Sequence, residues 1–282
     1  MRISGIQIIR VTLCVGLIVA VGLFIWPAAT HAIEVWSTDE EFTFGFVIPP
    51  LSAGVVWLRR RALARAIGPG AHGGLAIVLA GIALSVIGGR MGLHAIAGLA
   101  VIPLLWGVAA YLQGWKAARV LAFPIAFLAF GFGLYRGLLD SVGFTLQEIT
   151  AMGAATIGRA VGLPVVRDGL ILHSQQFAFV VAEQCSGMSS LLSLLALGAL
   201  WVSSARGPIP ARLAVMLGIL PLVVIANTTR VTLVLLVATW FGQDAALGFF
   251  HGASSLVLFA LALLGLLVLS RLLGCEAPTF AF

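Results

Sequence analysis

A cysteine stands at the boundary between a short apolar run and a long one. Phe179 to Ala182 is followed by Glu183-Gln184-Cys185-Ser186-Gly187, and an almost unbroken apolar run then extends from Met188 to Val202. This pattern is typical of an extended strand that leads into the outer end of a membrane-spanning helix. A thiol at a helix start faces unpaired N–H groups and the positive end of the helix dipole, which favour the nucleophilic thiolate. The alternative is a buried cysteine that acts as a small hydrophobic side chain.

An arginine and a histidine complete a possible set of reacting groups. Arg230 interrupts an aliphatic run and shares a helix face with Asn227. It follows Arg212, at the inner boundary, by about 27 Å of helix, which places it near the outer boundary. His251 begins the next apolar run at the same depth. A thiol, a base and a cation suit acyl transfer through a thioester. The alternatives are an arginine that snorkels to lipid headgroups and a histidine merely tolerated at the interface.

The composition places these groups in a membrane protein. Of the 282 residues, 61% are hydrophobic and only 9% are charged, whereas soluble domains carry roughly 25% charged residues. The net charge of +6 does not indicate a nucleic-acid partner, because the basic residues lie in short loops between apolar segments. The sequence therefore predicts an all-α polytopic membrane protein, with residues 1–282 forming a single integral membrane domain.

Apolar segments of spanning length recur along the whole chain. About eight transmembrane helices are predicted, at about 6–28, 43–58, 74–90, 92–113, 118–138, 187–204, 213–238 and 248–272. With both termini in the cytoplasm, eleven of the sixteen basic residues lie on the inner side or at its boundary, and nine of the ten acidic residues lie outside or near the outer face. The opposite orientation would reverse this bias, so the positive-inside rule favours this topology.

The longest segment between spans lies between the fifth and the sixth. Residues of about 139–186 are predicted to form an extracytoplasmic insert. Within it, apolar residues at helical spacing indicate an amphipathic helix over about 145–162. Asp168-Gly169, between β-branched and aliphatic residues, predicts a hairpin turn, and Phe177 to Ala182 offers a third strand. The result is a small β-hairpin or meander that leads to Cys185, inside a catalytic core of about 163–260.

The three cysteines lie far apart in this topology. Cys14 is within the first span and Cys275 follows the last, so Cys185 is a lone thiol on the outer side, where structural cysteines are normally paired. No histidine or cysteine pair has metal-ligand spacing, and no metal site or other cofactor is expected.

These motifs resemble the exosortase/archaeosortase family. The resemblance is carried by Ala182-Glu183-Gln184-Cys185-Ser186-Gly187, by Asn227-Thr228-Thr229-Arg230 and by His251, in that order, and it covers most of residues 36–260. An early family segment is echoed by Phe42 to Pro49, where Thr43 and Phe44 replace the usual serine and histidine. By the match to the motifs, Cys185 is the nucleophile and Arg230 and His251 are the other catalytic residues. Asn227, Ser186, Gly187 and Glu183 are supporting residues.

The resemblance implies a membrane-embedded cysteine protease or transpeptidase. Its partners would be secreted proteins with a C-terminal sorting signal of the PEP-CTERM kind, which has a short motif, a transmembrane helix and a basic tail. The enzyme would lie in the bacterial inner membrane with its active site at the extracytoplasmic face. Hydrolysis or transfer of the new C-terminus to an acceptor would complete the reaction. A polytopic transporter and a non-catalytic membrane assembly protein are the alternatives. A transporter usually has paired halves and charges near the midplane, which this sequence lacks.

Overall fold

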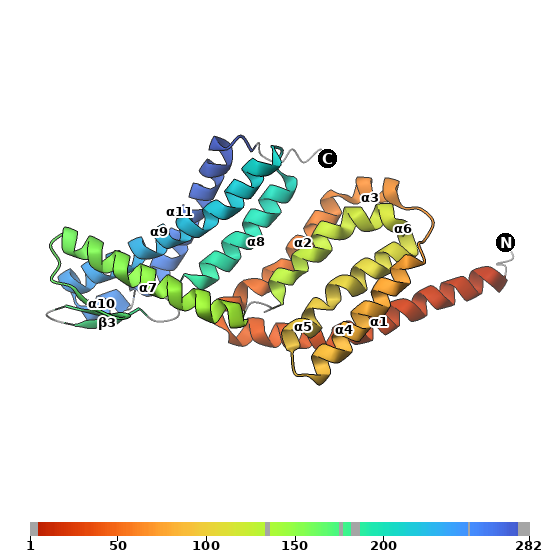
Figure 1. Ribbon diagram of the computed structural model, residues 1–282, viewed down its shortest axis with the longest axis horizontal. Helices are drawn as coiled ribbons and strands as arrows, with labels where there is room; N and C mark the ends of the chain where they lie inside the picture. The colour runs from red at the N-terminus through yellow and green to blue at the C-terminus, as the bar shows by residue number, and fades with distance from the viewer. Residues whose placement is uncertain (1–4, 133–135, 175–176, 182–186, 248, 276–282) are drawn as a thin grey trace. The chain divides into compact units, whose positions relative to one another are not determined.

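The computed structural model describes residues 5–132, 136–174, 177–181, 187–247 and 249–275. These residues form mainly helices, together with one small sheet of three strands (Figure 1). The chain divides into two compact units, Met1–Leu134 and Tyr135–Ala281. The prediction of a mostly helical polytopic fold with a small sheet is confirmed in outline. The assignment of domains stays a prediction.

The first unit is built from helices alone in its described part. Only the connection 67–72 is rich in glycine and proline. The elements are α1 (Gly5–Thr38), the 3₁₀ helix η1 (Glu40–Val47), α2 (Ile48–Leu58), α3 (Arg60–Ala66), α4 (Gly73–Arg90), α5 (His94–Leu99), α6 (Val101–Phe127) and the 3₁₀ helix η2 (Leu128–Gly131). The helix α1 continues through Pro27 to Thr38, well past residue 28, where the first span was predicted to end. Asp39 then caps η1 by accepting a hydrogen bond from the Glu41 N–H, at 3.0 Å.

Glycines allow two helices of this unit to approach closely. A Cβ added at Gly107 of α6 would lie 2.8 Å from the Val78 nitrogen of α4, and one at Gly74 would lie 2.7 Å from the Gly107 carbonyl oxygen. No larger residue fits there without displacing backbone. Contacts between small residues are how helices commonly associate in membranes, where burial of apolar surface adds little.

The helix α6 reverses direction at Gly114, which has a positive φ of 84° and a ψ of 168°. The Trp106 Nε1–H donates to the Ala118 carbonyl oxygen at 2.8 Å, whereas twelve residues of straight helix would separate these positions by about 18 Å. The bend lies between the predicted fourth and fifth spans. The second arm ends at Phe127 and η2 ends at Gly131, so the prediction that the fifth span reaches residue 138 is wrong.

The second unit combines helices with the three-stranded sheet. Its elements are α7 (Arg136–Ala160), β1 (Val166–Asp168), β2 (Ile171–His173), β3 (Ala178–Val180), α8 (Met188–Ser204), α9 (Ile209–Phe241), α10 (Gln243–Leu247) and α11 (Phe249–Leu272). The strands are antiparallel in the order β1-β2-β3. Gly169, with a φ of 58°, lies in the turn between β1 and β2, which confirms the hairpin. The amphipathic helix is confirmed, but α7 begins nine residues before the predicted residue 145.

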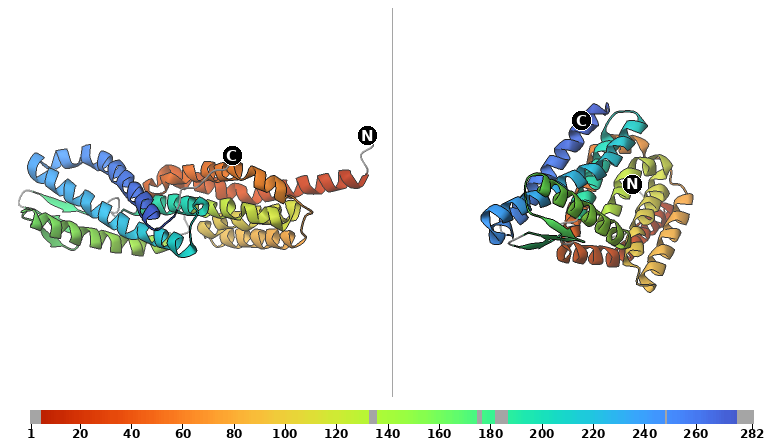
Figure 2. Two further views of the ribbon diagram at one scale, coloured as in Figure 1. Left: turned by 90° about the horizontal axis from the view of Figure 1, so that it is seen from above. Right: turned by 60° about the vertical axis from the view of Figure 1, so that its left-hand side comes forward.

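The sheet packs against α7, which precedes it in the sequence, and against α9, which follows it. One buried cluster joins Ala151, Ala154 and Ala155 of α7 to Leu172 of β2, Val181, and Val231 and Leu235 of α9. In the left view of Figure 2 the strands lie between α7 and the end of α9. The small alanines let α7 come close to α9, and the strands fill the space beyond. This arrangement fixes the end of β3, which leads toward Cys185, against α9.

Membrane-spanning capacity can be judged from the length and composition of the helices. In the part of the chain that the structure describes, five stretches are long and apolar enough to cross a membrane: Val15–Thr38, Glu41–Leu58, Gly73–Arg90, His94–Gly131 and Ile209–Phe241. Met188–Ser204 and Phe259–Leu272 are shorter apolar helices. The protein is an integral membrane protein with several helical spans. The number of eight spans stays a prediction.

Candidate active site

The guanidinium of Arg230 is enclosed within the protein. Arg230 lies in the C-terminal half of α9, and only 8% of the residue is exposed. A charged group in a spanning helix costs about 3 kcal/mol by insertion scales and usually faces a protein cavity. An arginine that snorkels to lipid headgroups would instead be exposed along its length. The burial therefore contradicts the snorkelling alternative and directs Arg230 into the interior of the second unit.

Asn227 lies one turn before Arg230, and a residue of α7 holds its side chain. The Asn227 Nδ2–H donates to the Thr150 Oγ1 at 3.0 Å, and the two residues are 5% and 1% exposed. The helices approach closely here, because a Cβ added at Gly153 of α7 would lie 2.6 Å from the Thr228 Cγ2. A hydrogen bond shielded from water in this way fixes the orientation of the amide.

Gly187 brings the start of α8 to the same place. It precedes α8 with a φ of 80° and a ψ of 10°, a left-handed conformation that favours glycine. A Cβ added there would lie 3.1 Å from the Asn227 Cγ and 3.3 Å from its Nδ2. Residue 187 therefore favours glycine for its backbone conformation, and a larger side chain there would press against the Asn227 amide. The Gly187 carbonyl accepts the first helical bond of α8 from the Leu191 N–H at 2.9 Å, so the predicted helix start is confirmed.

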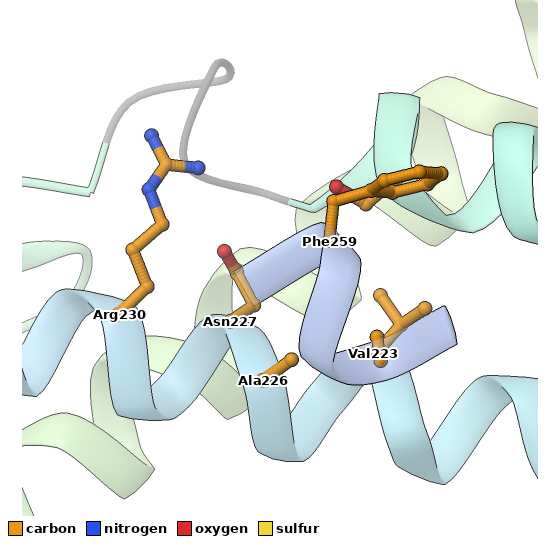
Figure 3. Close-up of a pocket in the computed structure, with 7 residues that line it drawn as sticks. Val223, Ala226, Asn227, Arg230 and Phe259 are labelled. Carbon is orange, nitrogen blue, oxygen red and sulfur yellow. The ribbon is translucent and has the colours of Figure 1, made fainter. Parts of the chain in front are cut away.

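A small pocket lies beside Asn227 and Arg230. Its lining comes from three helices of the second unit: Ser190 of α8, Val223, Ala226, Asn227 and Arg230 of α9, and Phe259 and Ala262 of α11. Figure 3 shows Arg230 and Asn227 extending from α9 to the same side, with Phe259 close by. The cavity has a volume of about 20 Å³, which is room for about one water molecule. Four of its lining residues are apolar, and three are polar: Ser190, Asn227 and Arg230.

The chain segment that precedes the stretch 182–186 is anchored to α9 through the sheet. Val181 follows β3, is 0% exposed and belongs to one buried cluster with Val231 and Leu235 of α9. Its N–H donates to the Leu170 carbonyl at 2.9 Å. Val181 is thus anchored to the part of α9 that follows Arg230, whereas Gly187 contacts Asn227, which precedes it. The two described residues that flank the stretch 182–186 lie on either side of Arg230 along α9.

The structure reaches only part of the predicted site. Gly187, Asn227 and Arg230 are brought together, whereas Cys185, Ser186 and Glu183 lie outside the described residues. His251 lies in the first turn of α11, and its side chain is not described. It precedes the pocket residue Phe259 by eight residues, or about 12 Å along the helix. The assignment of Cys185 and His251 to this site therefore stays a prediction.

The described polar groups of this region suit hydrogen bonding better than metal binding. Within the described ranges, no group of three or more His, Cys, Asp or Glu side chains is placed to hold a metal ion. The described polar groups of the pocket are one amide, one hydroxyl and one guanidinium, from Asn227, Ser190 and Arg230. These groups donate hydrogen bonds to a carbonyl or an oxyanion rather than coordinate a cation.

Thr150 is a site residue that sequence reasoning missed. It lies 77 positions before Asn227, in a helix recognised only by its apolar spacing. One signal was available, namely a threonine on the apolar face of an amphipathic helix. Such residues need a buried hydrogen-bonding partner, but the sequence does not say which one.

A matched pair of substitutions tests the role of Thr150. Thr150→Val keeps the shape of the side chain but removes the acceptor for the Asn227 amide, so we expect a loss of about 1–3 kcal/mol of stability. We also expect a lower rate of reaction at this site. Thr150→Ser keeps the hydroxyl and should retain most of both. Thermal unfolding in detergent and the turnover of substrate measure the two effects, and equal behaviour of the two variants would contradict the role.

Comparison with known proteins identifies the family. The family model described as "Transmembrane exosortase (Exosortase_EpsH)" matches residues 36–268 of the chain. The comparisons with curated proteins and with solved structures gave no significant match. The matched region contains Gly187, Asn227 and Arg230, together with most of the described spans. The chain therefore belongs to the transmembrane exosortase family, whose members are membrane transpeptidases or proteases of the cysteine type that act on secreted proteins with C-terminal sorting signals.

Proposed function

We propose that this protein cleaves C-terminal sorting signals by nucleophilic attack of the Cys185 thiolate on a substrate carbonyl. The observation that carries the proposal is the contact of Gly187 with Asn227, one helical turn from the buried Arg230. Only one residue stands between Cys185 and Gly187, so their Cα atoms are at most about 7.6 Å apart. The covalent chain therefore limits how far Cys185 can lie from Asn227.

The charges of the site would stabilise both anions of the proposed reaction, the thiolate and the oxyanion. Cys185 lies two residues before Gly187, which caps the N-terminus of α8, where the helix dipole and free N–H groups stabilise an anion. Arg230 contributes a guanidinium group, and its burial strengthens the field of that group at short range. These groups support the thiolate before attack and the oxyanion after it. Ser186 and Glu183 are proposed as supporting residues on the same stretch.

The proposed reaction follows ordinary acyl transfer. His251 takes the proton of the Cys185 thiol, and the thiolate adds to the scissile carbonyl carbon, whose oxygen becomes an oxyanion facing Arg230. The C–N bond then breaks, and the leaving amine receives the proton from His251. The thioester is opened by water or by the nucleophilic group of an acceptor, which restores the thiol. This sequence of steps needs no oxidant and no metal.

The proposed substrates are secreted proteins that end in a short motif, a transmembrane helix and a basic tail, as in signals of the PEP-CTERM kind. The site would face the extracytoplasmic side of a bacterial inner membrane, with both chain termini in the cytoplasm. The charge asymmetry of the sequence supports this orientation. Membership of an enzyme family favours catalysis over the transporter and scaffold alternatives.

The orientation can be tested with two single cysteine substitutions. Gly169 lies in the hairpin turn and Ala62 in the basic helix α3, and both positions are exposed. An impermeant thiol reagent added outside the cell should label Gly169→Cys but not Ala62→Cys, in a background with the native cysteines replaced. After permeabilisation both should be labelled. Labelling of Ala62→Cys alone in intact cells would reverse the topology and remove the proposed site from the outer face.

The function itself is tested with one tagged candidate substrate. Cells that carry the gene should release the tagged protein from its C-terminal helix, and cells that lack it should retain the full-length form in the membrane. Mass spectrometry of the released form locates the cleaved bond. Equal amounts of the released form in both strains would contradict the proposal for that substrate class.

A further inference from the structure

A strip of cations lies on the second arm of α6 in the first unit. Lys116, Arg119 and Phe123 are three and four residues apart, so they share one helix face, and Lys116 and Arg119 are exposed. The Arg59 guanidinium, which comes from the end of α2, lies over the Phe123 ring at 5.5 Å from its centroid. We define Arg59, Lys116, Arg119 and Phe123 as the cationic strip. Its length along α6 is about 10 Å.

The strip is assembled by packing and is not one basic loop. Arg59 and Arg119 are sixty residues apart in the sequence, and two backbone bonds hold the connecting segment against the bend of α6. The Gly68 N–H donates to the Gln113 carbonyl and the Ala71 N–H to the Ala110 carbonyl, both at 3.0 Å. A Cβ added at Gly114 would lie 2.6 Å from the Pro69 carbonyl oxygen. The relative position of the cations is therefore fixed by the fold.

The sequence around this surface is rich in cations and contains no carboxylate side chain. The chain has no Asp or Glu between residues 42 and 139, a stretch that includes all of α2, α3, α4, α5 and α6. Arg60, Arg61 and Arg65 add three more exposed cations on α3. The field of this surface is therefore strongly positive, and it attracts anions from outside the protein.

Two tryptophans show the depth at which the strip lies. Trp57 is 67% exposed and carries the Arg60 guanidinium over its ring at 4.6 Å. Trp115 is 38% exposed and immediately precedes Lys116. Exposed tryptophans at the ends of spanning helices lie at the level of the lipid headgroups. The cations beside them are thus at the depth of lipid phosphates, which an acidic protein or a nucleic acid in the aqueous phase would reach less well.

We propose that the cationic strip binds the phosphate of an anionic phospholipid headgroup. The exposed Arg119 offers a guanidinium group, which matches the oxygens of a phosphate in bidentate hydrogen bonds, and the exposed Lys116 adds a second charge. Arg59, over the Phe123 ring, adds to the positive field beside them. Basic pockets between transmembrane helices bind anionic headgroups by the same chemistry. This site shares no residue with the candidate active site, and its existence does not depend on the orientation of the protein or on its reaction.

The test is a lipid titration of the full chain in neutral detergent, followed by native mass spectrometry. Phosphatidylglycerol should bind the wild type with clear preference over phosphatidylcholine. Lys116→Gln combined with Arg119→Gln should lower the affinity for the first phosphatidylglycerol molecule by roughly thirtyfold. Arg119→Lys retains the charge and should retain most of the binding. The matched control is Arg206→Gln combined with Arg271→Gln, which removes two exposed cations of the second unit and should leave this first binding event unchanged.

Three results would overturn the proposal. One is equal binding of phosphatidylglycerol and phosphatidylcholine, and another is an equal loss of binding in the strip variant and in its control. The third is displacement of the lipid by millimolar inorganic phosphate, which would indicate a site for free anions. An unchanged unfolding temperature of the strip variant in phosphatidylcholine shows that it is folded. Because binding is read without substrate, failure here leaves the proposed reaction untouched, and failure of the reaction leaves this test valid.

Discussion

Cys185→Ala is expected to abolish processing, with a loss of roughly 10⁴-fold or more, because removing a catalytic nucleophile removes the covalent pathway as a whole. The variant should still insert into the membrane, since alanine is tolerated next to a helix start. Substrates should then keep their C-terminal helix and accumulate in the membrane. Immunoblots of membrane and released fractions, at matched enzyme levels, measure the effect.

The controls for Cys185 use the chemistry of its side chain. Cys185→Ser should be nearly as inactive, because a hydroxyl is far harder to ionise than a thiol. Replacing Cys14 and Cys275 should leave activity intact, and Cys275 is buried in any case. An impermeant thiol reagent should inactivate the wild type and the variant without Cys14 and Cys275 alike. Full processing by Cys185→Ala would exclude the thioester and return the transporter and scaffold alternatives.

Arg230→Lys is expected to lower kcat/KM by roughly 10² to 10³, the range found when one donor to an oxyanion is removed. Lysine keeps the positive charge and the long stem, but it lacks the planar fork of donors. Since Arg230 is 8% exposed, a role in lipid anchoring would not explain such a loss. Expression level and unfolding temperature show whether the variant is folded, and kinetics with a tagged substrate give the rate.

The same substitution elsewhere separates chemistry from general charge effects. Arg271→Lys changes an exposed arginine near the end of α11 and should keep near wild-type activity. If Arg230→Lys also kept it, Arg230 would have no geometric task toward the carbonyl, and only its charge would matter. Arg230→Gln would then be needed to learn whether even the charge contributes.

Local features of the second unit could be predicted from the sequence. The Asp168-Gly169 turn has a residue pair that accepts a positive φ, and the flanking β-branched and aliphatic residues alternate in strands that pair as expected. The start of α8 follows from Gly187, where polar residues give way to an apolar run. These predictions succeeded because the determinants lie within a few residues of each other.

Features that depend on distant parts of the chain could not be predicted in this way. Hydropathy continues past Gly131 without a change that would mark the end of η2, so the fifth span was extended to residue 138. The pairing of Thr150 with Asn227 joins two helices, and its existence depends on the close contact at Gly153. The contact of Arg59 with Phe123 in the cationic strip likewise needs the bend at Gly114. Without contact information, a single sequence contains no signal that names such partners.

The anchoring of Val181 and Gly187 on either side of Arg230 has a consequence for the length of the chain between them. Five residues span this interval, and adding one would cost little in loop-closure free energy. Yet an insertion of one residue between Cys185 and Gly187 would change the greatest possible distance between Cys185 and Asn227 by up to about 3.5 Å. The number of residues in this stretch must then be preserved in natural variation as strictly as the identity of Cys185. Homologues should exchange the side chains around Cys185 more readily than they gain or lose a position.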